Sequence, residues 1–291
     1  MTVLRSLLFV PGNRAEMLTK AAPLRPDALV PDMEDSVPED EKVNARQITA
    51  AFLPHLAQGG VPVIPRVNAL ETGLLEADLA AVVGPHIYGV SVGKIYTPQD
   101  VATIAALLAR LEQHAGVPIG QTKLVLWMET AMAIVHAYAI CTASPRIVAV
   151  GFGGEDFTND MGIERTTDDS EVAVPRSLVC VAARAANVLA LDTPYFLFRD
   201  PDGLTQNALA SKKIGFKGKF AIHPAQIDLI NATFSPSAAE LAQAQRIVAA
   251  FEAAAQAGKG STSLDGKVVD VPVVKRARAL LEVAERLQSR A

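Results

Sequence analysis

Short hydrophobic runs recur along the chain, and a cluster of polar residues follows each of them. Apolar and polar positions do not alternate cleanly within these runs, which is typical of strands buried on both faces of a parallel sheet. We predict eight strands, at residues 6–10, 28–33, 61–67, 88–95, 123–128, 147–152, 188–191 and 219–222. Stretches with apolar residues at three- and four-residue spacing alternate with these runs and predict helices at 15–24, 41–56, 74–83, 98–114, 131–143, 170–186, 204–213 and 236–255.

A strand followed by a helix, eight times over, predicts a (β/α)8 TIM barrel. A doubly wound open sheet is the alternative, but no Gly-x-Gly-x-x-Gly follows the first strand, which weakens a dinucleotide-binding fold. We predict that residues 1–257 form the barrel domain. Residues 258–291 read as a Gly- and Ser-rich linker and a last amphipathic helix that opens at Asp270. This C-terminal extension could pack on its own barrel, and we favour packing on a neighbouring subunit.

Composition and charge argue against several classes of protein. The chain carries 27 Lys and Arg against 31 Asp and Glu, with no basic run, so we expect no nucleic-acid partner. No stretch reaches the roughly 18 apolar residues of a membrane helix, and the first residues lack a signal-peptide pattern, so we expect a cytoplasmic protein without a membrane partner. Cys141 and Cys180 lie in apolar surroundings and are expected to be buried, reduced thiols.

Polar residues follow almost every predicted strand. In a barrel these ends meet at one mouth, where the chemistry of such folds takes place. The residues are Asn13, Arg14, Asp32, Glu34, Asp35, Arg66, Asn68, Lys94, Glu129, Glu155, Asp156, Asp192 and His223. Carboxylates dominate this set, and hard oxygen ligands suit Mg²⁺, which can act as a Lewis acid on a carbonyl or enolate. Arg66 offers a two-pronged fork for a substrate carboxylate.

Long motifs in this chain resemble the HpcH/HpaI aldolase family, and within it the citrate lyase β-subunit and malyl-CoA lyase group. They are RSLLFVPGNR (5–14), DMEDSVPEDEKVNAR (32–46), PRVN (65–68), WMET (127–130), GFGGEDFTNDMG (151–162), GFKGKFAIHPAQI (215–227), FSPS (234–237) and DGKVVDVP (265–272). The resemblance implies a Mg²⁺-dependent TIM barrel, trimeric or a multiple of that, which cleaves or forms 3-hydroxyacyl-CoA thioesters. Two departures, Pro31 and the VGK of residues 92–94, bear on substrate details rather than on the chemistry.

The resemblance also implies roles for individual residues. Glu129 and Asp156 match the metal ligands, and Arg66 matches the residue that holds the keto-acid carboxylate. Asp270 matches an acidic residue that reaches a neighbouring subunit's site and serves there in acid–base catalysis. Each also has a structural interpretation: Glu129 as a helix cap, Asp156 as a turn residue, Arg66 in an ion pair with Glu34 or Asp35, and Asp270 as an N-cap.

Other candidates have supporting roles or remain open. The carboxylates of Asp32, Glu34 and Asp35 would repel one another unless they were paired. We predict that they hold the metal site and Arg66 in place without binding the metal directly. Lys94 is either a pocket cation that binds substrate or a paired core lysine. Arg14 and Lys20 are either contacts to CoA phosphates or surface charges. We interpret Glu155 and His223 as structural, and Trp127 as barrel packing.

The predicted activity is therefore cleavage of a malyl-, citramalyl- or citryl-CoA thioester to a keto acid and acetyl-CoA, with Mg²⁺ as cofactor. Three alternatives stay open. One is an aldolase that acts on free hydroxy-keto acids, and a second is a malyl-CoA thioesterase. The third is the β-subunit of a citrate lyase complex, which would need an acyl-carrier partner. The sequence does not identify the acid.

Overall fold

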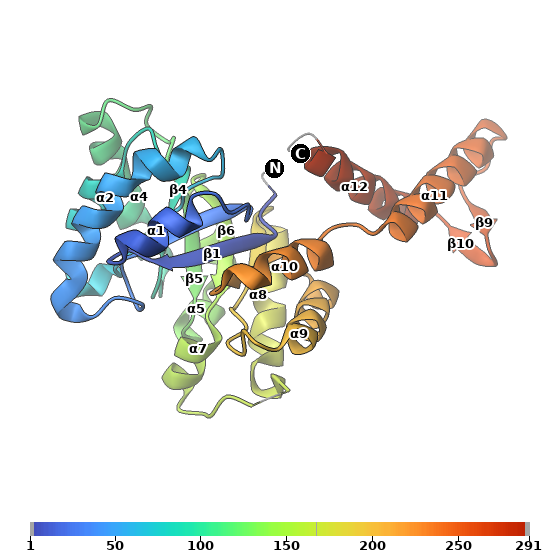
Figure 1. The fold of residues 1–291 in the computed structure, drawn as a ribbon. Coiled ribbons are helices and arrows are strands. Elements are labelled where there is room, and N and C mark those ends of the chain that lie inside the picture. The colour runs from blue at the N-terminus through green and yellow to red at the C-terminus, as the bar shows by residue number, and fades with distance from the viewer. Residues whose placement is uncertain (1–2, 167, 289–291) are drawn as a thin grey trace. The chain divides into compact units, whose positions relative to one another are not determined.

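The barrel strands form where the sequence places its buried hydrophobic runs. The computed structural model describes residues 3–166 and 168–288, and within them eight parallel strands close into a barrel in chain order, with the first strand paired to the eighth (Figure 1). The strands are β1 Ser6–Pro11, β2 Ala28–Asp32, β3 Arg66–Val67, β4 Gly89–Val92, β5 Lys123–Met128, β6 Ile147–Phe152, β7 Leu189–Asp192 and β8 Gly218–Ala221. The prediction of a TIM barrel is confirmed.

β3 is much shorter than its predicted run of residues 61–67. Pro62 and Pro65 lie in this run and lack the N–H that a ladder hydrogen bond requires, so only an isolated bridge between Leu29 and Val63 precedes the strand. Arg66 and Val67 then pair with β4, and Arg66 also pairs with Asp32 of β2. Within the predicted run of residues 61–67, the regular strand is therefore limited to Arg66 and Val67.

The helices of the barrel follow the predicted alternation. They are α1 Ala15–Ala21, α2 Lys42–Gln58, α3 Leu75–Val82, α4 Pro98–His114, α5 Ala131–Val135, α6 Ala137–Thr142, α7 Gly154–Met161, α8 Ala173–Ala185, α9 Pro201–Ile214 and α10 Ile227–Phe234. The bounds of α4 match the prediction because Thr97 and Asp100 form a capping box and Pro98 occupies the first helical position. The predicted helix at 131–143 divides at His136, and α7 and α10 were not predicted.

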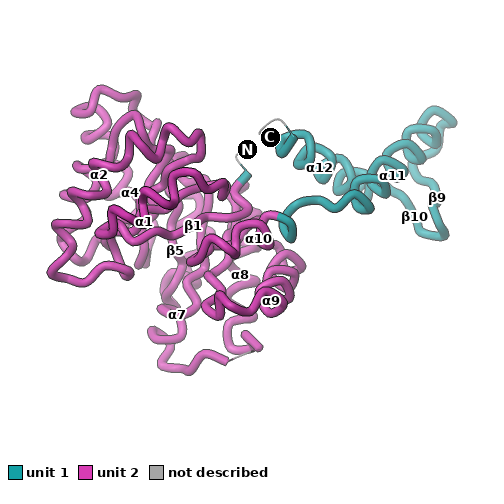
Figure 2. Tube along the Cα trace, in the orientation of Figure 1, with its two compact units in different colours: residues 1–3, 232–291 teal, residues 4–231 magenta. Residues whose placement is uncertain are grey.

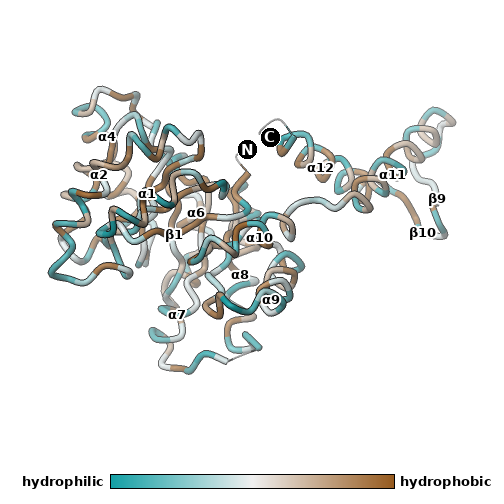
Figure 3. Tube along the Cα trace, in the orientation of Figure 1, coloured by the Kyte–Doolittle hydropathy of each residue, from teal (hydrophilic) through white to brown (hydrophobic). Residues whose placement is uncertain are grey.

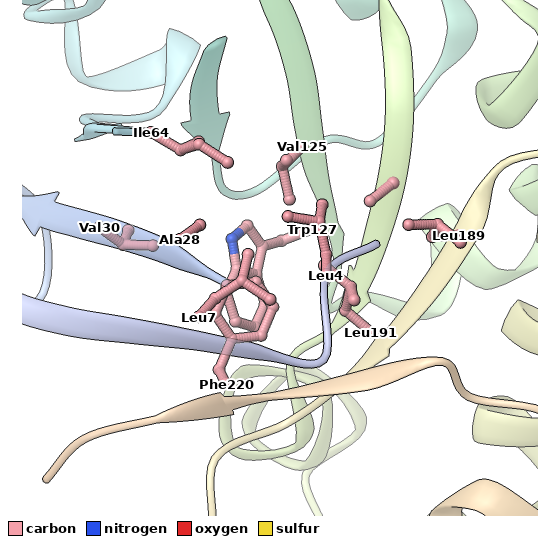
Figure 4. Packing of buried hydrophobic residues seen from close by; sticks show 11 residues of the cluster. Leu4, Leu7, Ala28, Val30, Ile64, Val125, Trp127, Leu189, Leu191 and Phe220 are labelled. Carbon is pink, nitrogen blue, oxygen red and sulfur yellow. The ribbon is translucent and has the colours of Figure 1, made fainter. Parts of the chain in front are cut away.

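The inside of the barrel is filled by side chains from most of its strands (Figure 4). Phe9, Trp127 and Phe220 pack ring against ring near the carboxyl ends of their strands, with centroids 4.2 to 5.8 Å apart. The indole N–H of Trp127 donates a 2.8 Å hydrogen bond to Ser91 Oγ, which satisfies its one donor. This aromatic layer supports the prediction that Trp127 packs in the barrel.

The contacts of the chain divide it into two compact units, Leu4–Asn231 and a second unit that contains the residues from Ala232 onward (Figure 2). The second unit has a long helix, α11 Ala238–Gln256, which packs along α12 Val271–Gln288. Hydrophilic and hydrophobic residues alternate along the turns of both helices (Figure 3). This unit begins at Ala232, and the barrel boundary expected at residue 257 stays a prediction.

The predicted Gly- and Ser-rich linker, AGKGSTSLDGK (257–267), contains most of an antiparallel hairpin. Its strands are β9 Thr262–Leu264 and β10 Lys267–Val269. Asp265 and Gly266 connect them with φ values of 52° and 75°, the left-handed conformations that a tight two-residue hairpin turn requires. Asp-Gly between two short segments that contain the β-branched residues Thr262, Val268 and Val269 was the signal for this turn. Among the described residues, no helix is long and apolar enough to cross a membrane.

Candidate active site

A cavity of about 450 Å³ opens at the carboxyl ends of the strands. It is lined by Phe9, Asp32, Asp35, Ser36, Arg66, Trp127, Glu129, Gly153, Gly154, Glu155, Asp156, Thr193, Pro194, Phe196 and Ile222. These residues follow β1, β2, β3, β5, β6, β7 and β8 or end them, so the cavity lies where TIM barrels carry out chemistry. A second cavity of about 430 Å³ lies beside α3 and α4, where Glu76 and Arg110 pair with each other.

Glu129 follows β5 directly and is a deeply buried carboxylate of the cavity, with 3% of its surface exposed. The backbone N–H of Lys94 donates a 2.5 Å hydrogen bond to its Oε1. Two glycines make room for the carboxylate. A β-carbon would lie 2.9 Å from Oε1 at Gly93, and 2.5 Å from Oε2 at Gly153. The glycines are therefore needed for the close approach of the backbone to this side chain.

Three carboxylates crowd this part of the cavity with unfavourable electrostatics. Burial raises the pKa of Glu129 to about 8, and the negative charges of Asp156 and Glu34 add to the effect. Burial likewise raises the pKa of Asp156 and of Glu34. Oε2 of Glu34 is buried and makes no hydrogen bond to any described residue, although Nη1 of Arg66 lies 3.2 Å away. A divalent cation would relieve this repulsion, and the oxygen-only donor set suits Mg²⁺.

Asp156 reaches the same cavity from the first turn of α7, after β6. Within residues 3–166 and 168–288, no group of three or more Asp, Glu, His or Cys side chains is arranged to surround a metal ion. A Mg²⁺ site usually takes only one or two protein carboxylates, and water supplies the other ligands. Glu129 and Asp156 therefore fit the ion, and their assignment as ligands stays a prediction.

Arg66 lies across the cavity from this pair of carboxylates in a dense ionic cluster. Its Nε and Nη2 donate hydrogen bonds of 2.7 and 2.6 Å to the two oxygens of Asp32, and its Nη1 donates one of 2.9 Å to Asp35. The guanidinium stands 4.5 Å from the centre of the Phe9 ring. Burial alone would raise the pKa of Asp32, but Arg66 outweighs it and holds that pKa below its usual range. The predicted ion pairing of Arg66 is thus present, with Asp32 as the main partner.

Lys94 pairs with the same acidic cluster. Its ammonium lies 3.0 Å from Glu34 and 3.2 Å from Asp35, and these negative charges raise its pKa although burial opposes them. Lys94 does not belong to the lining of the cavity. Of the two interpretations left open, the structure favours a paired lysine, and substrate binding by Lys94 remains a prediction.

Several residues that follow predicted strands do not line the cavity. The carboxylate of Asp192 is fully buried between Lys219, at 2.6 Å, and Arg176, at 2.8 Å. Asn68 donates hydrogen bonds to Asp78. His223 caps a short 3₁₀ helix and stacks on Phe198, with ring centroids 5.0 Å apart, in keeping with its structural interpretation. Asp192 and His223 therefore do not join the other polar residues at the cavity, although Thr193 after β7 and Ile222 after β8 line it.

The remaining candidates have simple local environments. Arg14 is exposed at the N-terminus of α1, Lys20 is exposed in its last turn, and neither lines the cavity. In the second unit, Oδ1 of Asp270 accepts a 3.2 Å hydrogen bond from the N–H of Val273, so the N-cap interpretation is present. Cys141 and Cys180 are buried free thiols as predicted, and burial raises the pKa of each to about 12.

The apolar part of the cavity was not predicted from the sequence. Pro194, Phe196 and Ile222 line it after β7 and β8, and the pattern of polar residues at strand ends does not indicate them. The apolar stretch PYFLF at residues 194–198, directly after a predicted strand, was the available signal.

Comparisons with known proteins agree with this geometry. The model of the HpcH/HpaI aldolase/citrate lyase family matches residues 5–224. Citrate lyase subunit beta of Escherichia coli K12 is 39% identical over 281 residues, which cover 97% of this chain and 93% of that protein. A (3S)-malyl-CoA thioesterase of Cereibacter sphaeroides KD131 is 35% identical over 285 residues, with 97% and 95% covered.

Solved structures show the same similarity. CitE of Mycobacterium tuberculosis in complex with magnesium, acetoacetate and coenzyme A is 26% identical, with a TM-score of 0.76 and coverage of 97% of this chain and 98% of that one. A citrate lyase of Burkholderia xenovorans LB400 has a TM-score of 0.87 at 20% identity, with 99% and 93% covered, which speaks for the fold alone. The predicted family resemblance is confirmed.

Proposed function

Because this chain belongs to the HpcH/HpaI aldolase/citrate lyase family, we propose that it is a Mg²⁺-dependent carbon–carbon lyase. Its substrate is a 3-hydroxyacyl-CoA thioester, which it cleaves to a keto acid and acetyl-CoA. The observation that carries the proposal is one cavity that holds the buried, crowded carboxylates Glu129 and Asp156 together with the fork of Arg66. The magnesium, acetoacetate and coenzyme A bound to CitE of M. tuberculosis support the choice of ion and of thioester.

Glu129 and Asp156 are the residues that would hold the ion. When bound there, Mg²⁺ supplies Lewis acidity toward the hydroxyl and carboxylate oxygens at C3 of the substrate. Arg66 orients that carboxylate and stabilises the charge that develops as the bond breaks. Its guanidinium is held by two hydrogen bonds to Asp32 and lies over the ring of Phe9. Phe9 and Trp127 line the cavity and pack against Phe220, so this part of the site is aromatic.

The reaction is a cleavage between C2 and C3 of the acyl chain. The C3 hydroxyl loses its proton and becomes the carbonyl of the keto acid, while the electron pair of the breaking bond passes to the thioester and forms an enolate. Asp270 of a neighbouring subunit then donates a proton to C2 of that enolate, which completes acetyl-CoA. In the reverse direction Asp270 removes this proton. The role requires an assembly, and we propose a trimer or a multiple of one.

Two other activities are also consistent with particular relatives. Hydrolysis of the malyl-CoA thioester is suggested by the (3S)-malyl-CoA thioesterases, which match nearly the whole chain. Action as a subunit on a carrier-bound thioester is suggested by the relatives named citrate lyase subunit beta. Both would use the same cavity, so the products and the required carrier distinguish them.

A substrate panel tests the proposal. Malyl-, citramalyl- and citryl-CoA and the corresponding free acids are incubated with the purified protein and Mg²⁺, and keto acid and free thiol are measured separately. A lyase releases keto acid without free thiol and stops when EDTA removes the metal. Free thiol would indicate the thioesterase. Keto acid from free acids alone would indicate the aldolase, and no release from any compound would reject the proposal.

A further inference from the structure

Charge is distributed unevenly around the cavity. The residues that follow β2, β3, β5 and β6 are ionic, among them Asp32, Arg66, Glu129 and Asp156. The side formed after β7 and β8 is apolar and consists of Pro194, Phe196 and Ile222, which we call the β7–β8 wall. Thr193 also lies on this side, but its hydroxyl accepts a 3.4 Å hydrogen bond from the N–H of Gly154.

The shape of the cavity limits how a substrate can be oriented. Its floor is closed, because Phe9, Trp127 and Phe220 pack together beneath it. The long CoA arm must therefore leave through the mouth. In the proposed reaction the carboxylate and hydroxyl on C3 face the ionic side, so the fourth substituent of C3 faces the β7–β8 wall.

The cavity lacks a second cation for a second substrate carboxylate. Among the described residues that line it, Arg66 alone is positively charged, and Asp32 and Asp35 already bind its guanidinium. Lys94 is held by Glu34 and Asp35 outside the lining. A carboxylate pressed against the β7–β8 wall would lose water without gaining a charged partner, and such burial is strongly unfavourable.

We propose that the β7–β8 wall selects thioesters whose fourth C3 substituent is small and apolar, such as methyl, over those with a carboxymethyl group. This inference rests on the proposed lyase function and adds the class of acid. Phe196 is the residue of the wall best suited to substitution, because 51% of its surface is exposed and its replacement disturbs little core packing. Ile222 lines the wall next to β8.

The test compares kcat/KM for three CoA thioesters that differ only at this position: malyl-CoA with hydrogen, citramalyl-CoA with methyl and citryl-CoA with carboxymethyl. We expect citramalyl-CoA to exceed citryl-CoA by at least about tenfold, since one apolar group in a fitted pocket changes specificity by about 10- to 200-fold. Phe196→Ala should lower the methyl-to-hydrogen ratio several-fold. Ile222→Arg should raise citryl-CoA relative to citramalyl-CoA.

Leu197→Ala is the matched control. Leu197 is the next residue of the same loop, is 65% exposed and does not line the cavity, so its substitution should leave all ratios unchanged. Equal or better cleavage of citryl-CoA by the native protein would overturn the inference while leaving the lyase proposal intact. An equal loss with all three thioesters in Phe196→Ala would also overturn it, because Phe196 would then contact the CoA arm. No cleavage of any thioester would overturn the lyase proposal and this inference with it.

Discussion

The backbone N–H of Lys94 lies 2.5 Å from Oε1 of Glu129 and donates a hydrogen bond to it. Lys94 has a φ of 52°, an uncommon left-handed conformation for a residue with a side chain. This hydrogen bond favours the charged form of Glu129, which burial and neighbouring carboxylates oppose. One oxygen of Glu129 is thereby held in place, and Gly153 lies close to the other.

We predict that Gly153→Ala impairs the site without unfolding the barrel. The backbone at Gly153 has φ of −102° and ψ of 95°, which alanine tolerates, but its β-carbon would lie 2.5 Å from Oε2 of Glu129. Displacement of that carboxylate should lower kcat/KM by at least about tenfold. Overpacking should reduce stability by about 1–3 kcal/mol, measured by denaturant unfolding. Gly84→Ala is the control, because nothing lies within 4 Å of its β-carbon. Full activity of Gly153→Ala would contradict the prediction.

Glu129→Gln should weaken Mg²⁺ binding while preserving the fold. Glutamine has the same shape and can still accept the hydrogen bond from Lys94, but it removes a buried charge. Calorimetric titration with Mg²⁺ should show at least about a tenfold loss of affinity, and keto-acid release should fall with it. Glu76→Gln serves as the control, since Glu76 is exposed, pairs with Arg110 and does not line this cavity. Unchanged affinity in Glu129→Gln would show that the ion binds elsewhere.

Arg66→Lys should weaken binding of the keto acid. Lysine keeps the charge but cannot reproduce the two parallel hydrogen bonds that Arg66 donates to Asp32. In the condensation direction, KM for the keto acid should rise at least about tenfold, while Mg²⁺ affinity stays close to that of the native protein. Arg46→Lys is the matched control, because Arg46 pairs with Asp78 and does not line the cavity. The assignment fails if both substitutions change KM equally.

Asp270 should act in the site of a neighbouring subunit. We expect Asp270→Asn to keep the melting temperature, because asparagine can also accept the N-cap hydrogen bond from Val273, and to lose turnover. Co-expression of Asp270→Asn with Glu129→Gln should restore activity, since mixed assemblies then contain sites with both residues intact. Activity that never returns in mixed assemblies would place Asp270 outside the neighbour's site.

Stability should depend on pH through Glu112, which is fully buried on α4. It accepts hydrogen bonds of 2.8 and 2.7 Å from Arg146 and others from the N–H groups of Gly120 and Thr122, and its pKa falls to about 2 although burial opposes the shift. A depressed carboxylate pKa stabilises the fold above the unfolded value of about 4.3, and this contribution is lost as pH falls toward 2.

The contribution of this group is about 3 kcal/mol at neutral pH, from the size of the shift. Glu112→Gln should therefore be destabilised at pH 7 by roughly that amount or somewhat more, because Arg146 loses its charged partner. Denaturant midpoints of the native and variant proteins should converge between about pH 4.3 and pH 2. A constant difference across that range would rule out Glu112 as the titrating group.

Local patterns in the chain were sufficient to predict the eight strands and most of the helices. The runs before Asp32, Glu129 and Gly153 are continuous and apolar, so a parallel barrel was predictable from them. Signals that are short or polar were harder to interpret. α7 begins in two glycines and acidic residues, and the hairpin at Asp265–Gly266 is flanked by strands of only three residues each.

The sequence alone also predicted that Glu129, Asp156 and Arg66 lie at one end of the barrel, because the carboxyl ends of its parallel strands meet at the same mouth. Only the tertiary structure decided which residues face the cavity there. Asp192 follows the same pattern as Asp32, yet it is buried with Lys219 and Arg176 away from the cavity. The apolar wall of Phe196 and Ile222 likewise became visible only in three dimensions. The physical reason is that a shift of one residue in strand register turns a side chain to the opposite face, and register is set by contacts between strands distant in sequence.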